Sequence, residues 1–161
     1  MTVSTRLAVM EEGRIAQLGE PHEVYEAPRT RAVAEFIGDV NVLAGTVTDP
    51  AGGVVALEEG GEAELGAGRV AAGAVALALR PEKIAIQKIA APGEPEANTL
   101  EGTVEDIAYL GDMSIYHVRL DGGGLLRVAR ANRFRALEEP IEWESRVRLS
   151  WDSRSLVLLA E

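Results

Sequence analysis

The side chains best suited to ligand binding form a run of arginines between residues 127 and 135. Guanidinium groups bind phosphates through paired hydrogen bonds, and aromatic rings beside them can stack on bases. The arginines are Arg127, Arg130, Arg133 and Arg135, and the rings near them are Tyr116, His117 and Phe134. The chemistry that this group could support is the binding of nucleic acid.

The overall charge argues against that interpretation. The chain has 26 acidic and 16 basic residues, a net charge of −10, and such a chain is repelled by phosphate backbones unless its basic residues cluster. The alternative is a polar strand edge that contacts a neighbouring subunit or balances the acidic residues of 138–144. We therefore expect no nucleic-acid partner, and we keep Arg127 and Arg130 as candidate subunit-contact or ligand positions.

Two further motifs supply the other candidates. Arg80-Pro81-Glu82 follows an apolar strand, and it is either a strand end with a local ion pair or a contact with another subunit. Tyr109-Leu110-Gly111-Asp112 is a predicted turn in which Gly111 takes a positive φ, and ligand contact is open there as well. The candidate positions from these motifs are Arg80, Glu82, Tyr109 and Gly111.

The residues needed for catalysis are missing from this sequence. A phosphate-binding P-loop needs a lysine after a glycine, whereas Lys83 and Lys88, the two lysines, follow a glutamate and a glutamine. His22 and His117 are not at metal-ligand spacing, there are no cysteines, and no serine lies in a nucleophile signature. We predict no catalytic, cofactor-binding or metal-binding residue.

The first 40 residues differ from the rest in their predicted secondary structure. Alternation over residues 6–19 predicts a hairpin, and two short helices are expected at 21–26 and 31–37. A lone hairpin is marginal in water, so residues 1–40 indicate the end of a larger domain. We expect them to be disordered, rearranged or packed on another copy. No apolar run approaches the roughly 20 residues that span a bilayer, so no membrane insertion is expected.

The remaining residues repeat themselves. Residues 41–49 match residues 98–106, with Asn, Leu, Gly, Thr, Val and Asp at the same offsets, 57 residues apart. A later strand also recurs, at 75–81 and 147–153. Two matches in the same order indicate a duplicated β-unit.

Glycine-rich turns separate many short predicted strands in this part of the chain, which is typical of a barrel or sandwich. Each half holds four or five strands, the size of an OB-type barrel. We predict a mainly β fold of two tandem OB-like barrels over residues 41–161, with repeat units at about 41–90 and 98–161.

The order of these motifs resembles the ATP-binding subunits of bacterial ABC importers. Residues 6–21 are similar to the segment after that family's switch histidine, and residues 22–41 to the exit from its nucleotide-binding domain. Residues 79–82 and 109–111 are similar to motifs of its C-terminal TOBE region, a pair of OB-type units. The most similar subgroup is the spermidine/putrescine type, with Glu20 and Ala32 as mild departures.

The resemblance implies a regulatory and dimerisation role. Residues 1–40 would be the remnant of a nucleotide-binding domain, and the TOBE-type barrels would pair as a homodimer that couples the ATPase to transport. The partners implied are the importer's membrane permease subunits, and ATP and Mg would bind only to the full-length parent. The implied location is the cytoplasmic face of the inner membrane. The family's ATPase motifs would precede Met1, so we expect a fragment of a longer protein.

Two rival functions stay open at this point. Paired barrels of this kind could sense an oxyanion or a metabolite, and an OB-type barrel could bind nucleic acid through the arginine run. The sequence names neither the transported substrate nor the contact residues beyond the motifs above.

Overall fold

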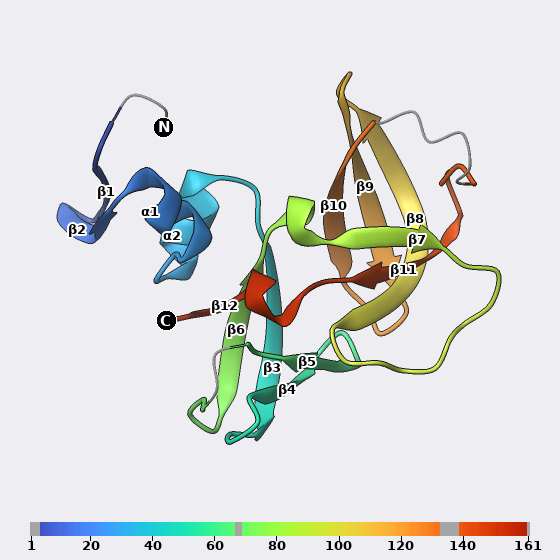
Figure 1. The fold of residues 1–161 in the computed structure, drawn as a ribbon, viewed down its shortest axis with the longest axis horizontal. Helices are drawn as coiled ribbons and strands as arrows, with labels where there is room; N and C mark the ends of the chain where they lie inside the picture. Colours follow the sequence, from blue (N-terminus) through green and yellow to red (C-terminus); the bar gives the residue numbers. More distant parts are fainter. Residues whose placement is uncertain (1–3, 67–68, 133–138, 161) are drawn as a thin grey trace.

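The computed structural model describes residues 4–66, 69–132 and 139–160. It opens with a hairpin followed by two short helices (Figure 1). Their bounds are β1 (Leu7–Glu11), β2 (Arg14–Gly19), α1 (Pro21–Glu26) and α2 (Arg31–Ile37). Gly13 turns the hairpin with a φ of 78°, Pro21 begins α1, and the hydroxyl of Thr30 caps α2 by accepting from the N–H of Val33 at 3.3 Å. The predicted hairpin and helices are confirmed.

Two five-stranded antiparallel sheets follow (Figure 1). The first has the order β12-β6-β3-β4-β5 and the second β10-β9-β8-β11-β7. The strands of the first are β3 (Asn41–Asp49), β4 (Val54–Leu57), β5 (Glu62–Glu64), β6 (Ala74–Leu79) and β12 (Leu156–Leu159). Those of the second are β7 (Ala85–Lys88), β8 (Thr99–Tyr109), β9 (Met113–Leu120), β10 (Leu125–Ala131) and β11 (Arg146–Ser150). Each sheet curls as half of a barrel, so the predicted mainly β fold with two OB-like units is confirmed.

The two sheets match strand by strand. β3 lies between β6 and β4 as β8 lies between β11 and β9. Both strands also shift register at the same point, between Val47 and Asp49 in one and between Val104 and Asp106 in the other. A bulge is a specific feature of a strand and not an accident of packing, so its recurrence supports the duplication that the sequence repeat indicates.

Each repeat gives its last strand to the sheet of the other. β6 leads through the 3₁₀ turn η1 (Pro81–Lys83) to β7, which pairs with β11. In the same way β11 leads through η2 (Ser153–Ser155) to β12, which pairs with β6. The predicted units 41–90 and 98–161 therefore describe the order of the sequence, whereas each sheet draws strands from both.

A shared core holds the two sheets together. Leu43 of the first sheet and Val104 and Leu149 of the second are fully buried and belong to one contiguous apolar cluster. Burial of apolar side chains is the main stabilising term in folding. Because both sheets contribute to the same cluster, neither could be removed without exposing the other.

The N-terminal unit, residues 4–40, packs on the first sheet of its own chain, which corrects the expectation that residues 1–40 are disordered, rearranged or packed on another copy. Ala34 of α2 and Val40 pack against Ala78 of β6 and Leu159 of β12. The N–H of Ala160 also donates to a carbonyl of the N-terminal unit, that of Arg29, at 2.8 Å. The small side chains on the outer face of the sheet give the helix an apolar surface to approach, which alternation in the sequence does not reveal.

The hairpin of the N-terminal unit keeps one face exposed. Val9 packs inward against Val24 of α1. Met10 and Ile15, which are opposite one another in the hairpin, are 63% and 59% exposed, and Phe36 is 75% exposed. Within the described residues, no helix is long and apolar enough to cross a membrane.

Candidate functional site

Arg80 lies between the end of β6 and the start of η1 at Pro81. Only 6% of the residue is exposed, so its charge needs partners inside the chain. Its guanidinium lies 4.3 Å from the ring centre of Tyr25. It donates at 3.0–3.2 Å to the main-chain carbonyls of Tyr25, Ala34, Gly38 and Asp39. Arg80 thus joins the N-terminal unit to the sheets, and its donors point into the chain instead of toward a second subunit.

Glu82 and Lys83 extend this joint to α1. The hydroxyl of Tyr25 donates to Oε1 of Glu82 at 2.5 Å, and Nζ of Lys83 lies 3.2 Å from the carboxylate of Glu26. Burial, followed by the hydrogen bond to Glu82, raises the pKa of Tyr25 to about 12. The phenol is protonated at neutral pH in any case, and the raised pKa extends to alkaline pH the range over which it donates this hydrogen bond. The sequence motif Arg80-Pro81-Glu82 therefore connects the first sheet to the N-terminal unit, and Arg80 and Glu82 have their partners there instead of in a local ion pair.

Arg127 of β10 contacts the segment that leads into β3. Its Nη1 lies 2.9 Å from the carboxylate of Asp39, and its Nη2 donates to the carbonyl of Val40 at 3.1 Å. The side-chain amide of Asn41 holds the peptide groups of Arg127 at 2.8 and 2.9 Å. Arg127 is therefore occupied by an acidic side chain and the start of the first repeat, which leaves it little capacity for phosphate.

The repeated asparagine was missed as a structural residue, although the repeat carries the signal. Asn41 opens β3 and bonds to β10, the outer strand of the second sheet. Asn98 precedes β8 and its Oδ1 accepts from the N–H of Glu64 in β5, the outer strand of the first sheet, at 2.9 Å. The two asparagines therefore join each sheet to the other in equivalent ways.

Tyr109 is the last residue of β8, and Gly111 lies in the turn between β8 and β9. Gly111 has a φ of 82°, which confirms the predicted positive φ, and its carbonyl accepts from the side-chain amide of Asn132 at 2.8 Å. Tyr109 is 71% exposed and Leu110 63%. Turn geometry accounts for Gly111, whereas Tyr109 is accessible to a partner.

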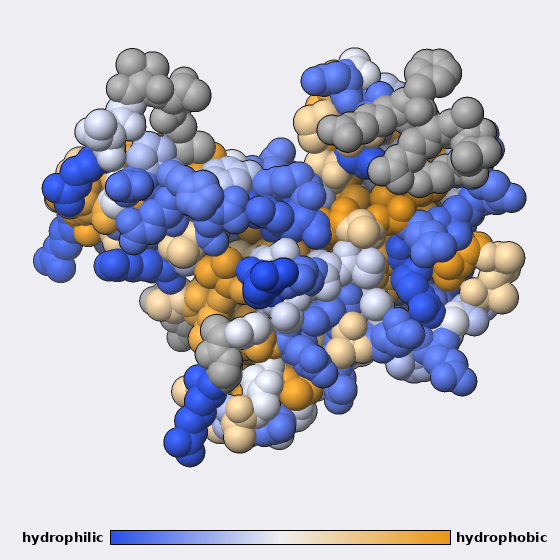
Figure 2. Space-filling view, viewed as in Figure 1, coloured by the Kyte–Doolittle hydropathy of each residue, from blue (hydrophilic) through white to orange (hydrophobic). Residues whose placement is uncertain are grey.

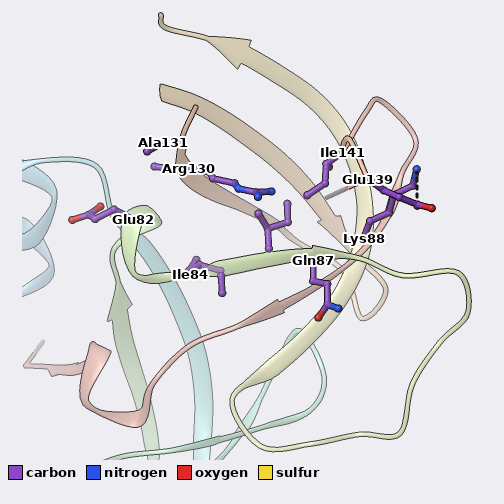
Figure 3. Close-up of a pocket in the computed structure, with 11 residues that line it drawn as sticks. Glu82, Ile84, Gln87, Lys88, Arg130, Ala131, Glu139 and Ile141 are labelled. Carbon is purple, nitrogen blue, oxygen red and sulfur yellow. Dashed lines mark ion pairs between the residues drawn. The ribbon is translucent and has the colours of Figure 1, made fainter. Parts of the chain in front are cut away.

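A cavity of about 710 Å³ lies between β7 and β10, and we call it the cleft. Figure 3 shows Glu82 at one end of the cleft and Lys88 with Glu139 at the other, with Arg130 reaching in from β10. Lys88 and Glu139 form an ion pair at 3.6 Å. The apolar lining includes Ile84, Ile86 and Ile141.

The cleft lies between the outer strands of the second sheet, where peptide groups point into it. In an antiparallel ladder alternate residues exchange hydrogen bonds with the neighbouring strand. The N–H of Ile89 donates to the carbonyl of Arg146, so the peptide groups of Ile89 point toward β11. By alternation, the peptide groups of Ile86 and Lys88 point away from β11 and into the cleft. On β10, the bonds from Asn41 to Arg127 place Ala129 and Ala131 on the edge that faces away from β9. The cleft therefore offers main-chain donors and acceptors as well as charges.

A second cavity, about 210 Å³, lies where turns of the two sheets meet. Arg148 donates to Glu101 at 2.8 and 3.0 Å, and Arg146 to Asp121 at 2.6 and 2.7 Å. The N–H of Gly93, then the arginines, lower the pKa of Glu101, and the hydrogen bond from Arg146 lowers that of Asp121. Sequence reasoning missed these pairs, because acidic residues are so numerous that none stands out.

Glu59 lines the same cavity and is less well satisfied. Its Oε2 is buried and has no hydrogen-bond partner among the described residues, and burial raises the pKa of its carboxyl. Its carbonyl lies against Gly122, where an added Cβ would be 1.6 Å from the oxygen. The turns of the two sheets therefore approach closely at a place where one carboxylate oxygen lacks a hydrogen-bond partner among the described residues.

The structure does not gather the six candidate residues into one site. Glu82 and Arg130 both line the cleft, whereas Arg80 and Arg127 contact the N-terminal unit. Tyr109 and Gly111 lie elsewhere, at the end of β8 and in the turn that follows it. Arg133 and Arg135 of the arginine run lie outside the described residues. Among the residues that the structure describes, no group of His, Asp and Glu could hold a metal ion.

The two sheets and the contacts between them define a duplicated OB-type β domain, with the N-terminal unit packed on its first sheet. The family model of the TOBE domain matches residues 77–159. The chain belongs to the TOBE domain family.

Two relatives extend the similarity to nearly the whole chain. The putrescine transport ATP-binding protein PotG of Escherichia coli strain K12 is 40% identical over 167 aligned residues, covering 99% of this chain and 43% of that protein. The spermidine/putrescine import ATP-binding protein PotA of Thermotoga maritima is 34% identical, covering 94% of this chain and 43% of that protein. The chain thus spans less than half the length of these relatives, and it matches their C-terminal part.

A solved structure shares the fold. The cytoplasmic molybdate-binding protein ModG, solved with molybdate bound, aligns with a TM-score of 0.59 over 73% of this chain and 94% of that chain. The sequence identity is 18%, so the likeness concerns the fold alone.

Proposed function

We propose that this chain is the C-terminal regulatory and dimerisation part of the ATP-binding subunit of an ABC importer of the putrescine/spermidine type. The observation that carries the proposal is the 40% identity to the putrescine transport protein over 99% of the chain. That match includes both the N-terminal unit and the two sheets, together with the joint between them.

In this function the chain performs no chemistry of its own. ATP and Mg would bind to the ATPase domain of the full-length parent, which pairs with membrane permease subunits at the cytoplasmic face of the inner membrane. Pairing of two TOBE-type regions would bias the ATPase pair between its open and closed states. Such a bias requires contacts that differ between the two states. The exposed Tyr109 and Leu110 are accessible for contacts of this kind.

A chimera tests the proposal. The matching part of the Escherichia coli putrescine transport protein is replaced by this chain, and ATP-dependent putrescine uptake is measured in cells that lack their own copy. The chimera should import putrescine faster than a control carrying only residues 1–40 of this chain at the same place. Equal uptake by the chimera and the control, at equal protein level, would contradict a coupling role for the sheets.

The cleft supports a second candidate, the sensing of a small ligand. Its cationic side chains, Lys88 and Arg130, and its inward-pointing peptide groups could bind an oxyanion or a polar metabolite. Thermal unfolding of the chain in molybdate, phosphate or putrescine tests this function. A rise in the midpoint with one of them supports sensing, and no rise with any of them removes it.

A further inference from the structure

The turn η1 touches three parts of the chain at once. It follows β6 of the first sheet and precedes β7 of the second. Arg80, Glu82 and Lys83 reach from this turn to α1 and to the end of α2, and we call these three residues the helix clamp. The N-terminal unit and both sheets therefore meet at the helix clamp.

Arg80 provides most of the bonds in the helix clamp. Three of its four acceptors, the carbonyls of Ala34, Gly38 and Asp39, lie in or just after α2. Carbonyls at the end of a helix lack partners within it and carry the negative end of the helix dipole. A buried guanidinium matches both needs, and its hydrogen bonds are stronger than those of a neutral donor.

The second repeat has a different arrangement at the equivalent position. When residues 75–81 are aligned with 147–153, Arg80 corresponds to Asp152 and η1 to η2. Asp152 accepts from the N–H and guanidinium of Arg154 at 2.9–3.1 Å, so its charge is satisfied inside its own turn. Both turns connect the same pair of sheets. The second repeat thus makes the connection without an equivalent of Arg80, so the connection itself does not require the helix clamp.

Glu82 links the helix clamp to the cleft. Its carboxylate accepts from Tyr25 of α1, and the same residue lines the cleft (Figure 3). The strand that follows, β7, forms one wall of the cleft. A displacement of α1 would therefore act on the end and on one wall of the cleft together.

We infer that the helix clamp transmits the position of the N-terminal unit to both sheets and to the cleft, with Arg80 as the positioning residue. The inference rests on the proposed function, in which the N-terminal unit moves with the ATPase domain. Coupling of this kind is reciprocal, so a change in the cleft would in turn bias the position of α1 and α2.

Amide hydrogen exchange of the intact chain tests the helix clamp. Arg80→Met keeps the volume and removes the donors, Arg80→Lys keeps the charge, and Arg154→Met in η2 is the matched control. Arg80→Met should speed exchange in α1, α2 and β7 by about tenfold or more, since four charge-assisted hydrogen bonds are lost. Exchange in β8 and β9 should not change. Exchange rates in Arg80→Lys should lie between those of Arg80→Met and the unsubstituted chain. Exchange rates in Arg154→Met should equal those of the unsubstituted chain.

The ionisation of Tyr25 gives a readout that loss of stability alone would not move. Burial and then Glu82 raise the pKa of Tyr25, while the charge of Arg80 lowers it by a smaller amount. Arg80→Met should release α1 and bring the pKa of Tyr25 from about 12 toward 10.0, whereas removal of the charge with α1 still docked would raise it further. Carbon-13 NMR of labelled tyrosine measures this ionisation.

Unchanged exchange in α1 and α2, or a rise in the pKa of Tyr25, would overturn the inference. If Arg80→Met does not fold, Tyr25→Phe removes one bond of the helix clamp and keeps the ring, and it should speed exchange in α1 and β7 but not in β9. No change from Tyr25→Phe would contradict the inference as well. These experiments involve no ATPase domain, so their failure is distinct from failure of the chimera.

Discussion

Replacement of Gly102 by alanine tests the geometry of the duplicated strands. Gly102 pairs with Leu120 on one side and Val147 on the other. An added Cβ would lie 2.2 Å from the carbonyl oxygen of Arg119 and 2.9 Å from Cγ1 of Val118. The obstacle is backbone in a strand held between β8 and β10, so neither side can move without breaking a ladder.

The expected cost of Gly102→Ala follows from that obstacle. Overpacking costs about 1–3 kcal/mol, and a collision with backbone belongs at the upper end. In a chain of this size the thermal midpoint falls by about 2–4 °C per kcal/mol, so a loss of about 6–12 °C is expected. Gly45 is the equivalent position, but its nearest atoms are at 2.6 Å and belong to β4, which carries only the short β5 beyond it. Gly45→Ala should therefore cost less.

Gly38→Ala is the matched control. Gly38 has an extended φ of 170°, and the nearest atom to an added Cβ is 3.6 Å away, an ordinary contact. Reduced freedom of the unfolded chain should make this variant about 0.4–1 kcal/mol more stable. Differential scanning calorimetry of the three variants measures the order. A Gly102→Ala protein as stable as Gly38→Ala would refute the close approach of β8 and β9.

Three further predictions concern ionisable groups. Glu59→Gln should raise the thermal midpoint at pH 7, because it removes a carboxylate whose pKa is raised by burial. The gain should vanish near pH 4, where Glu59 itself is protonated, and a lower midpoint at pH 7 would contradict this prediction. The pKa values of Glu101 and Asp121 are lowered in the folded chain, so the stability that they contribute is present above their ordinary pKa values of 4.5 and 3.8 and is lost as the pH falls through the folded values. In urea unfolding between pH 3 and 7, the stability of Arg146→Met should therefore depend less on acid than that of the unsubstituted chain. The raised pKa of Tyr25 contributes stability that is complete below pH 10.0 and is lost as the pH rises through about 12. In Tyr25→Phe the helical circular dichroism signal should therefore fall less steeply with rising pH in this range, and an unchanged pH dependence would contradict this prediction.

Local features of the fold could be predicted because local patterns determine them. Pro21 and the Pro28–Arg31 stretch mark the limits of the helices, and the repeated Asn41 and Asn98 mark equivalent strands. The short β5 was missed, because Glu-Ala-Glu between glycines is too brief for a period to be recognised.

Long-range features could not be predicted in the same way. The exchange of β7 and β12 between the sheets depends on which strands become neighbours, and periodicity carries no information on that. Arg80 was singled out, but its partners come from 41 to 55 residues away, so its role in fixing the N-terminal unit was not readable from its motif. The ion pairs of Glu101 and Asp121 were missed because their arginine partners are distant in sequence and acidic residues are numerous.

Sedimentation equilibrium of the intact chain tests the central claim, that this TOBE-family chain is a dimerising regulatory part of a transport ATPase, most directly. The account predicts a reversible dimer, with a mass that approaches twice 17.2 kDa as the protein concentration rises. A mass that stays at 17.2 kDa up to the highest concentrations would contradict it.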